Sequence, residues 1–183
     1  RRLVIDIGGG STEIVAGETL DPVLAESVPF GCVSTTRQAF PDGRITGKRW
    51  DRASDAIERE MRGYSSQFRR FDWEEAVGSS GTVRAVASML SKGDSRAAID
   101  LSELGGIRDA LIDIGHVEQI DLPGLSTRRA PVIAGGVLIL EALQTTFGID
   151  HLGVSPFALR EGLLFDLKGR LEHRDPRDQT GPD

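Results

Sequence analysis

The chain opens with two short apolar runs on either side of a glycine-rich turn. Residues 3–5 (LVI) are continuously apolar, and residues 14–16 (IVA) form a second run after Asp6 and three glycines. A third stretch rich in strand-forming residues covers positions 23–30. Short apolar runs bounded by turn-forming residues are typical of strands. We therefore expect three consecutive strands that form an antiparallel meander.

A helical period replaces the strand pattern from Lys48 onward. Apolar side chains recur every three or four residues with charged residues between them, at Trp50, Ala53, Ile57, Met61, Tyr64 and Phe68. This spacing predicts one long amphipathic helix. Thr46 is its expected N-terminal cap.

The remainder of the chain alternates between strands and helices. We expect strands at 75–77 and 151–155, helices at 82–90, 102–114, 132–147 and 158–171, a loop at 121–131 and a disordered tail at 172–183. Ser102 is the expected cap of the helix that follows it, and Pro156 introduces the last helix.

The order of these elements, βββαβαβα, predicts a single α/β domain over residues 1–171. Its mixed five-stranded sheet would carry packed helices, which is the arrangement of a ribonuclease-H-like or actin-like half. Such halves usually occur in pairs with the ligand between them. Because the chain enters a strand within its first three residues, we also expect a further domain upstream.

Composition narrows the possible partners and the location. Acidic residues outnumber basic ones by 28 to 22, and aromatic residues make up only 5%, so we expect no nucleic-acid partner. A polyanionic ligand would need a local cradle or a metal. No apolar run reaches the roughly 20 residues that span a bilayer, so we expect no membrane span. One cysteine, Cys32, and three histidines make neither an internal disulfide nor a structural zinc site, which favours the cytoplasm.

The segment DIGGGSTE at 6–13 is the strongest candidate for chemistry. Asp6 ends a buried strand and is placed to hold hydrated Mg²⁺, which takes one or two carboxylates, and Glu13 follows within reach of the same volume. Glycines at positive φ would expose N–H groups to a phosphate, and hydroxyls would add donors. The expected phosphate-binding residues are Gly8, Gly9, Gly10, Ser11 and Thr12. The alternatives are a plain glycine hairpin with a solvated aspartate and a Rossmann turn. The latter is disfavoured because the turn enters a strand.

A second glycine turn, GSSGT at 78–82, links an expected strand to an expected helix. Its N–H groups and the helix dipole together favour an anion, so Gly78, Ser79, Ser80, Gly81 and Thr82 are further phosphate-binding candidates. A helix cap without any ligand is the alternative. The segment misses the G-x-S-x-G nucleophile elbow by one position.

Two features near the start of the 132–147 helix each have two readings. Gly135 and Gly136 weaken a helix unless close packing or a ligand compensates, and packing is the simpler reason. Arg128 and Arg129 either bind phosphate or lie in solvent.

Together these segments resemble the Ppx/GppA phosphatases of the acetate kinase, sugar kinase, heat-shock ATPase and actin (ASKHA) superfamily. The resemblance follows the family's order through IDIGGGSTEIV at 5–15, GSSGT at 78–82, RRAPVIAGGVLIL at 128–140 and VSPFALREGLL at 154–164. DIGGGSTE followed at this distance by ALREG is its specific part. It covers nearly the whole chain up to the tail.

The resemblance implies a hydrolase that uses Mg²⁺ to remove the terminal phosphate of inorganic polyphosphate or guanosine pentaphosphate. It implies that this chain is the second of two actin-like domains. The first would carry another phosphate loop and a glutamate that activates water, so this chain alone would be inactive. By position, Asp6 and Glu13 would be the catalytic and metal-binding residues, residues 8–11 would bind phosphate, and residues 78–82 would line the other side of the cleft.

Two rival functions stay open at this point. One is an ATP-using kinase or ATPase of the same superfamily, and the other is a non-catalytic actin-like sensor or assembly module. The intact Asp6, glycine turn and Glu13 favour turnover over the second rival. The preference between polyphosphate and guanosine pentaphosphate, and a homodimer of the full-length protein, are not decided by the sequence.

Overall fold

The computed structural model describes residues 1–18, 21–94 and 97–157, and the alternation of its first strand orients the sheet. In β1 (Arg2–Ile7), the side chains of Leu3, Ile5 and Ile7 are buried at 0–1% exposure. The residues between them face the opposite side of the sheet, because successive side chains of a strand alternate. One face of the sheet therefore belongs to the core, and the other carries Asp6.

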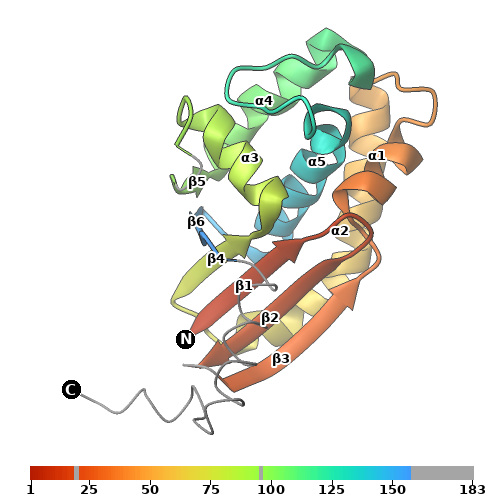
Figure 1. The fold of residues 1–183 in the computed structure, drawn as a ribbon. Helices are drawn as coiled ribbons and strands as arrows, with labels where there is room; N and C mark the ends of the chain where they lie inside the picture. The colour runs from red at the N-terminus through yellow and green to blue at the C-terminus, as the bar shows by residue number, and fades with distance from the viewer. Residues whose placement is uncertain (19–20, 95–96, 158–183) are drawn as a thin grey trace, which may run out of the picture.

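The sheet has six strands in the order β3-β2-β1-β4-β6-β5 (Figure 1). The first three strands form the predicted antiparallel meander, whereas β4 runs parallel to β1 and β6 runs parallel to β4. The remaining strands are β2 (Thr12–Glu18), β3 (Asp21–Val28), β4 (Glu75–Ser79), β5 (Ile99–Asp100) and β6 (His151–Val154). The prediction of five strands was one short, since β5 has only two residues and carries no readable period.

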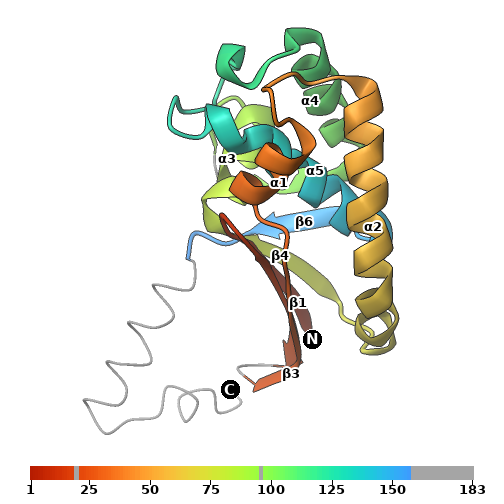
Figure 2. The same ribbon diagram turned by 90° about the vertical axis from the view of Figure 1, so that its right-hand side faces the viewer.

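The helices gather on the core face of the sheet, with α2 running alongside the first three strands (Figure 2). They are α1 (Cys32–Ala39), α2 (Gly47–Arg70), α3 (Ser80–Leu90), α4 (Leu101–Ile114) and α5 (Ala130–Phe147), with a 3-10 turn at Val117–Gln119. Helix α5 lies at the centre and packs against all four others. Its length and composition would suit a membrane span, but 72% of it is buried within the domain, as expected of a core helix.

The helix starts follow local chemistry, with one correction. The hydroxyl of Thr46 accepts a hydrogen bond from the Arg49 N–H at 3.4 Å, which confirms the predicted cap of α2. The predicted Ser102 cap of α4 was wrong. Asp100 caps this helix, because its carboxylate accepts from the N–H of Ser102 at 2.9 Å and from the Ser102 hydroxyl at 2.6 Å.

The paired glycines of α5 allow close helix packing. A Cβ at Gly135 would lie 2.5 Å from the carbonyl oxygen of Cys32 in α1, and a Cβ at Gly136 would overlap the Thr82 side chain in α3. Packing therefore accounts for both glycines. The expected helix at 158–171 and the expected tail at 172–183 lie outside the described residues.

Candidate functional site

The glycine turn between β1 and β2 caps the N-terminus of α1. The carbonyl oxygen of Gly8 accepts a hydrogen bond from the Cys32 N–H at 2.9 Å. The carbonyl of Gly9 accepts from the N–H groups of Val33 and Ser34 at 3.0 and 3.1 Å. These donors belong to the first turn of α1, where no carbonyl within the helix can reach them. The turn and the helix are therefore built as one unit.

The same bonds orient the other side of the turn. A trans peptide places its C=O and its N–H on opposite sides. Because the carbonyls of Gly8 and Gly9 face α1, the following N–H groups, those of Gly9 and Gly10, point away from it. Neither N–H has a hydrogen-bond partner among the described residues. Successive free N–H groups of this kind form an anion-binding concavity.

The expected positive φ at these glycines was wrong, since none of residues 8–10 adopts it. Close approach of main chains accounts for the small residues instead. A Cβ at Gly8 would lie 3.1 Å from the Ser11 carbonyl oxygen, and a Cβ at Gly31 would overlap the backbone of Gly9 and Gly10.

A row of four polar side chains crosses the sheet beside this turn. Ser27, Glu13, Asp6 and Ser79 are paired in register on four neighbouring strands, so their side chains share the face away from the helices. The Ser79 hydroxyl donates to Asp6 Oδ2 at 2.6 Å. Glu13 Oε1 accepts from the hydroxyls of Ser11 at 2.5 Å and Ser27 at 3.1 Å. The two carboxylates predicted from sequence are thus brought together and held by serines.

This pair of carboxylates fits a hydrated divalent cation. One oxygen of each carboxylate, Oδ1 of Asp6 and Oε2 of Glu13, makes no hydrogen bond or ion pair with a described residue. No cluster of three or more metal-ligating side chains occurs in the described part of the chain. Two carboxylates supplemented by water and phosphate oxygens match the preference of Mg²⁺.

At the second glycine segment, β4 passes directly into α3. Gly78 and Ser79 end the strand, and Ser80 begins the helix with a φ of 99°, a backbone conformation that a serine rarely adopts. The Ser80 hydroxyl accepts from the N–H groups of Thr82 at 3.3 Å and Val83 at 3.4 Å. Ser80 therefore caps the helix, and its backbone strain lies at a candidate site, where such strain is common.

A pocket of about 480 Å³ joins the two glycine segments. It lies between the glycine turn and the first turns of α1 and α3, and its polar lining includes Asp6, Gly8, Gly9, Ser80, Gly81, Arg84, Arg128 and Arg129. The three guanidinium groups make no hydrogen bond or ion pair with any described residue. They leave a concentrated positive charge in a protein of net charge −6. The pocket thus offers unpaired cations and N–H donors to a polyanion.

Three of the predicted phosphate-binding residues turn inward. The Thr12 hydroxyl donates to the Phe30 carbonyl at 2.6 Å, and the Thr82 hydroxyl donates to the Ile7 carbonyl at 3.3 Å. Gly78 is buried, and a Cβ there would lie 2.7 Å from Val83. These residues support the walls of the pocket, whereas Ser80 and Gly81 line it.

A comparison with known protein families decides the family. The model of the Ppx/GppA phosphatase family matches residues 1–171. The chain belongs to the Ppx/GppA phosphatase family.

Individual Ppx/GppA relatives agree with this assignment. The chain is 37% identical over 180 residues to a guanosine-5'-triphosphate,3'-diphosphate pyrophosphatase of Aeromonas hydrophila, covering 98% of this chain and 36% of the relative. It is 34% identical to a Haemophilus influenzae protein provisionally named an exopolyphosphatase, covering 98% of this chain and 56% of the relative. The chain therefore spans between about one third and just over half of the length of these relatives.

A solved Ppx/GppA structure confirms the fold. The family member of Aquifex aeolicus superimposes with a TM-score of 0.76 at 26% identity, covering 94% of this chain and 56% of the Aquifex chain. The actin-like fold expected from the order of elements is confirmed.

Sequence reasoning missed one arginine of this Ppx/GppA pocket and left two undecided. Arg84 follows Gly81 by three residues, so both lie on one face of α3. That spacing was the available signal. Arg128 and Arg129, for which phosphate and solvent were equally open, both line the pocket.

Proposed function

We propose that this domain is the phosphate-binding half of a Mg²⁺-dependent phosphatase that hydrolyses the terminal phosphoanhydride bond of inorganic polyphosphate or guanosine pentaphosphate. The observation that carries this proposal is one pocket that combines the Asp6 carboxylate, the glycine turn and three unpaired guanidinium groups. The names of the relatives, an exopolyphosphatase and a guanosine pentaphosphate pyrophosphatase, support the two substrates.

Each group has a separate task in the reaction. The N–H groups of the turn and the arginines bind the terminal phosphate and stabilise the charge that spreads over its oxygens. Asp6, held by Ser79, and Glu13, held by two serines, orient water molecules around that phosphate. A bound Mg²⁺ would be held by Asp6 and Glu13 and would add positive charge at the phosphate oxygens.

The proposal assigns the second wall of the cleft to another domain of the full-length protein. In-line hydrolysis needs a carboxylate that activates water on the far side of the phosphorus. The two acids of this domain lie side by side on β1 and β2, where both suit the metal. The relatives, which extend well beyond the matched region, have room for such a domain.

The test is phosphate release by the full-length protein. We expect release from polyphosphate or guanosine pentaphosphate in the presence of Mg²⁺ and none after chelation. ATP serves as the third substrate, because a kinase or ATPase of the same superfamily would prefer it. Turnover of ATP alone, or turnover unaffected by chelation, would refute the proposal.

A further inference from the structure

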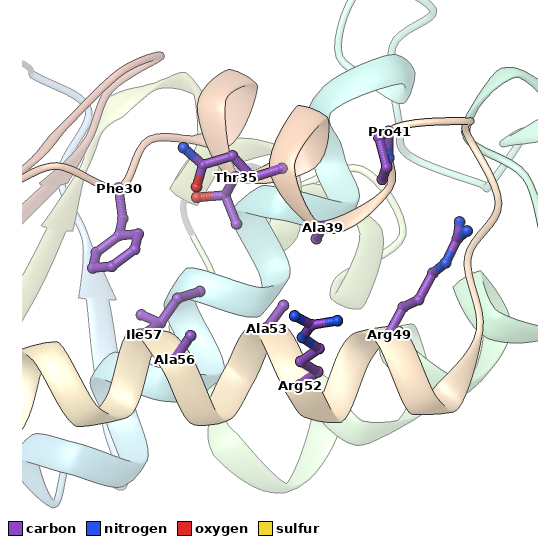
Figure 3. Close-up of a pocket in the computed structure, with 10 residues that line it drawn as sticks. Phe30, Thr35, Ala39, Pro41, Arg49, Arg52, Ala53, Ala56 and Ile57 are labelled. Carbon is purple, nitrogen blue, oxygen red and sulfur yellow. The ribbon is translucent and has the colours of Figure 1, made fainter.

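A second cavity, of about 410 Å³, lies between α1 and α2 and shares no lining residue with the phosphate pocket (Figure 3). Its walls are mainly apolar and come from Phe30, Ala39, Pro41, Ala53, Ala56 and Ile57. Cavities of about 300–1,000 Å³ with apolar walls and a few polar groups are typical of small-molecule sites. The polar groups therefore decide what this cavity could hold.

Thr35 places an unused hydroxyl in this cavity. Its side chain extends from α1 into the space above α2 in Figure 3. The residue is only 3% exposed, and its hydroxyl has no hydrogen-bond partner. The carbonyl of Gly31, one turn earlier, already accepts from the Thr35 N–H and the Ser34 hydroxyl. Buried hydroxyls normally have a partner, so this one is free to bond a ligand.

The neighbouring Thr36 shows that the vacancy is specific to Thr35. The Thr36 hydroxyl bonds the carbonyl oxygens of Cys32 at 2.7 Å and Val132 at 3.3 Å. It also accepts from the Gly135 N–H at 3.0 Å. The fold thus satisfies the hydroxyl that faces α5 and leaves the one that faces the cavity.

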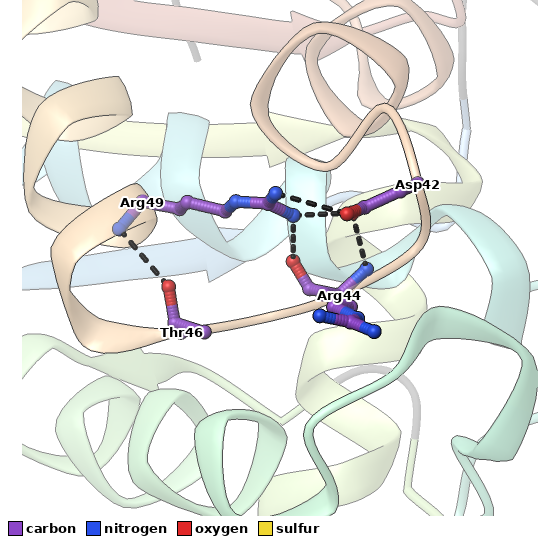
Figure 4. Close-up of polar contacts among 4 residues, drawn as sticks. All are labelled: Asp42, Arg44, Thr46 and Arg49. Carbon is purple, nitrogen blue, oxygen red and sulfur yellow. Dashed lines mark hydrogen bonds and ion pairs between the residues drawn. The ribbon is translucent and has the colours of Figure 1, made fainter.

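Two arginines of α2 lie at the rim, and only one has a free charge. Arg49 forms a bidentate ion pair with Asp42 and also donates to the Arg44 carbonyl (Figure 4). This hydrogen bond lowers the pKa of Asp42 below its usual range and raises the pKa of Arg49. Arg52 makes no ion pair or hydrogen bond with a described residue. The rim therefore presents one uncompensated positive charge.

We propose that this cavity binds a small aromatic anion. A flat ring system would pack against Phe30 and Ile57, where offset or edge-on aromatic contact is favourable. A polar atom on the ring would use the Thr35 hydroxyl, and the acidic group would pair with the Arg52 guanidinium. The site is separate from the proposed phosphatase site, so neither depends on the other.

The probe is 8-anilinonaphthalene-1-sulfonate, an aromatic sulfonate whose fluorescence rises when its rings leave water. We expect the full-length protein to bind one equivalent saturably. Arg52→Met should weaken binding about 10-fold, the loss of one charge-assisted contact. Ala53→Phe, which fills the cavity, should abolish binding. The neutral analogue N-phenyl-1-naphthylamine should bind less tightly than the sulfonate.

Controls separate this site from nonspecific binding and from the phosphate pocket. Arg59→Met, an exposed change elsewhere on α2, should leave the affinity unchanged, and tripolyphosphate should not displace the probe. Arg52 is also exposed, so its substitution leaves the core intact. Thr35→Val keeps the shape and removes only the hydroxyl, and it should weaken the sulfonate probe's binding several-fold. Affinity that survives both Arg52→Met and Ala53→Phe, or no saturable binding, would overturn the proposal.

Discussion

The hydroxyl of Ser79 donates a 2.6 Å hydrogen bond to Oδ2 of Asp6, across the pairing of two parallel strands. This bond ties the end of β1, just before the glycine turn, to the end of β4, just before α3. It fixes one carboxylate oxygen of Asp6 and leaves the other free. The two phosphate-binding segments predicted separately from sequence are therefore one structural unit.

Asp6→Asn in the full-length protein should lower phosphate release by about 100-fold or more, because clamping charge at the reacting phosphate is worth several kcal/mol. Asparagine keeps the size and the acceptor for Ser79, so the fold should persist. The measurement is the initial rate at saturating Mg²⁺, with Asp55→Asn on the exposed face of α2 as the control. A rate equal to that of the control would remove Asp6 from the reaction.

Arg84→Met should weaken binding of tripolyphosphate about 10-fold, since a hydrogen bond between charged groups contributes roughly 1.5–3 kcal/mol. The loss should shrink as salt is added, because screening weakens the interaction that the variant lacks. Calorimetric titration of the full-length protein at low and high ionic strength measures both effects. Arg59→Met is the matched control, and an equal loss in that variant would point to net charge alone.

Gly31→Ala should destabilise the domain by about 1–3 kcal/mol, because overpacking forces the backbone to shift. Its Cβ would overlap the glycine turn, whereas a Cβ at Gly63 in α2 would meet nothing within 4 Å. Gly63→Ala should therefore stabilise the domain by about 0.5–1 kcal/mol. Urea unfolding of the two variants makes the comparison, and equal effects would contradict the packing argument.

Glu141→Gln should change how stability depends on pH. Burial raises the pKa of the Glu141 carboxyl, although the Trp50 indole N–H and Arg108 oppose the shift. A raised folded pKa means that the stabilisation by this group is complete below its unfolded pKa of about 4.3 and is lost as pH rises through the folded value. Glutamine cannot ionise, so the variant should gain stability relative to the parent as pH rises. Urea unfolding at about pH 4 and about pH 7 provides the check, and parallel curves would contradict it.

The 183-residue chain alone should release no measurable phosphate from either substrate. Holding the reacting groups in line can contribute about 7–11 kcal/mol to catalysis, and one wall of a cleft cannot supply it. The comparison is between this chain and the full-length protein under the same assay. Similar rates would require a water-activating base within this domain, with Glu13 as the first candidate.

Elements with a strong period were predictable, and elements that depend on contacts were not. The meander and α2 follow from alternation and from helical spacing. Helix α1 was missed because its sequence, CVSTTRQA, contains β-branched and polar residues and no apolar stripe. Its first turn is satisfied by the carbonyls of Gly8 and Gly9, which lie far away in the sequence.

The candidate site shows the same division. Asp6 and Glu13 were found because a strand pair around a tight turn places them opposite each other. The serine bonds to these acids were not foreseen, since Ser27 and Ser79 reach them only through the registers of β3 and β4. The inward orientation of Thr12 and Thr82 likewise depends on which carbonyl oxygens pack nearby.

The hydrogen bonds between the glycine turn and α1 have a consequence for exchange of amide hydrogens with solvent. The amides of Cys32, Val33 and Ser34 are protected by acceptors on a loop, not by their own helix. Any opening of that loop therefore exposes these amides together, while the rest of α1 keeps its internal bonds. Their exchange rates report the stiffness of the glycine turn from residues that lie outside it.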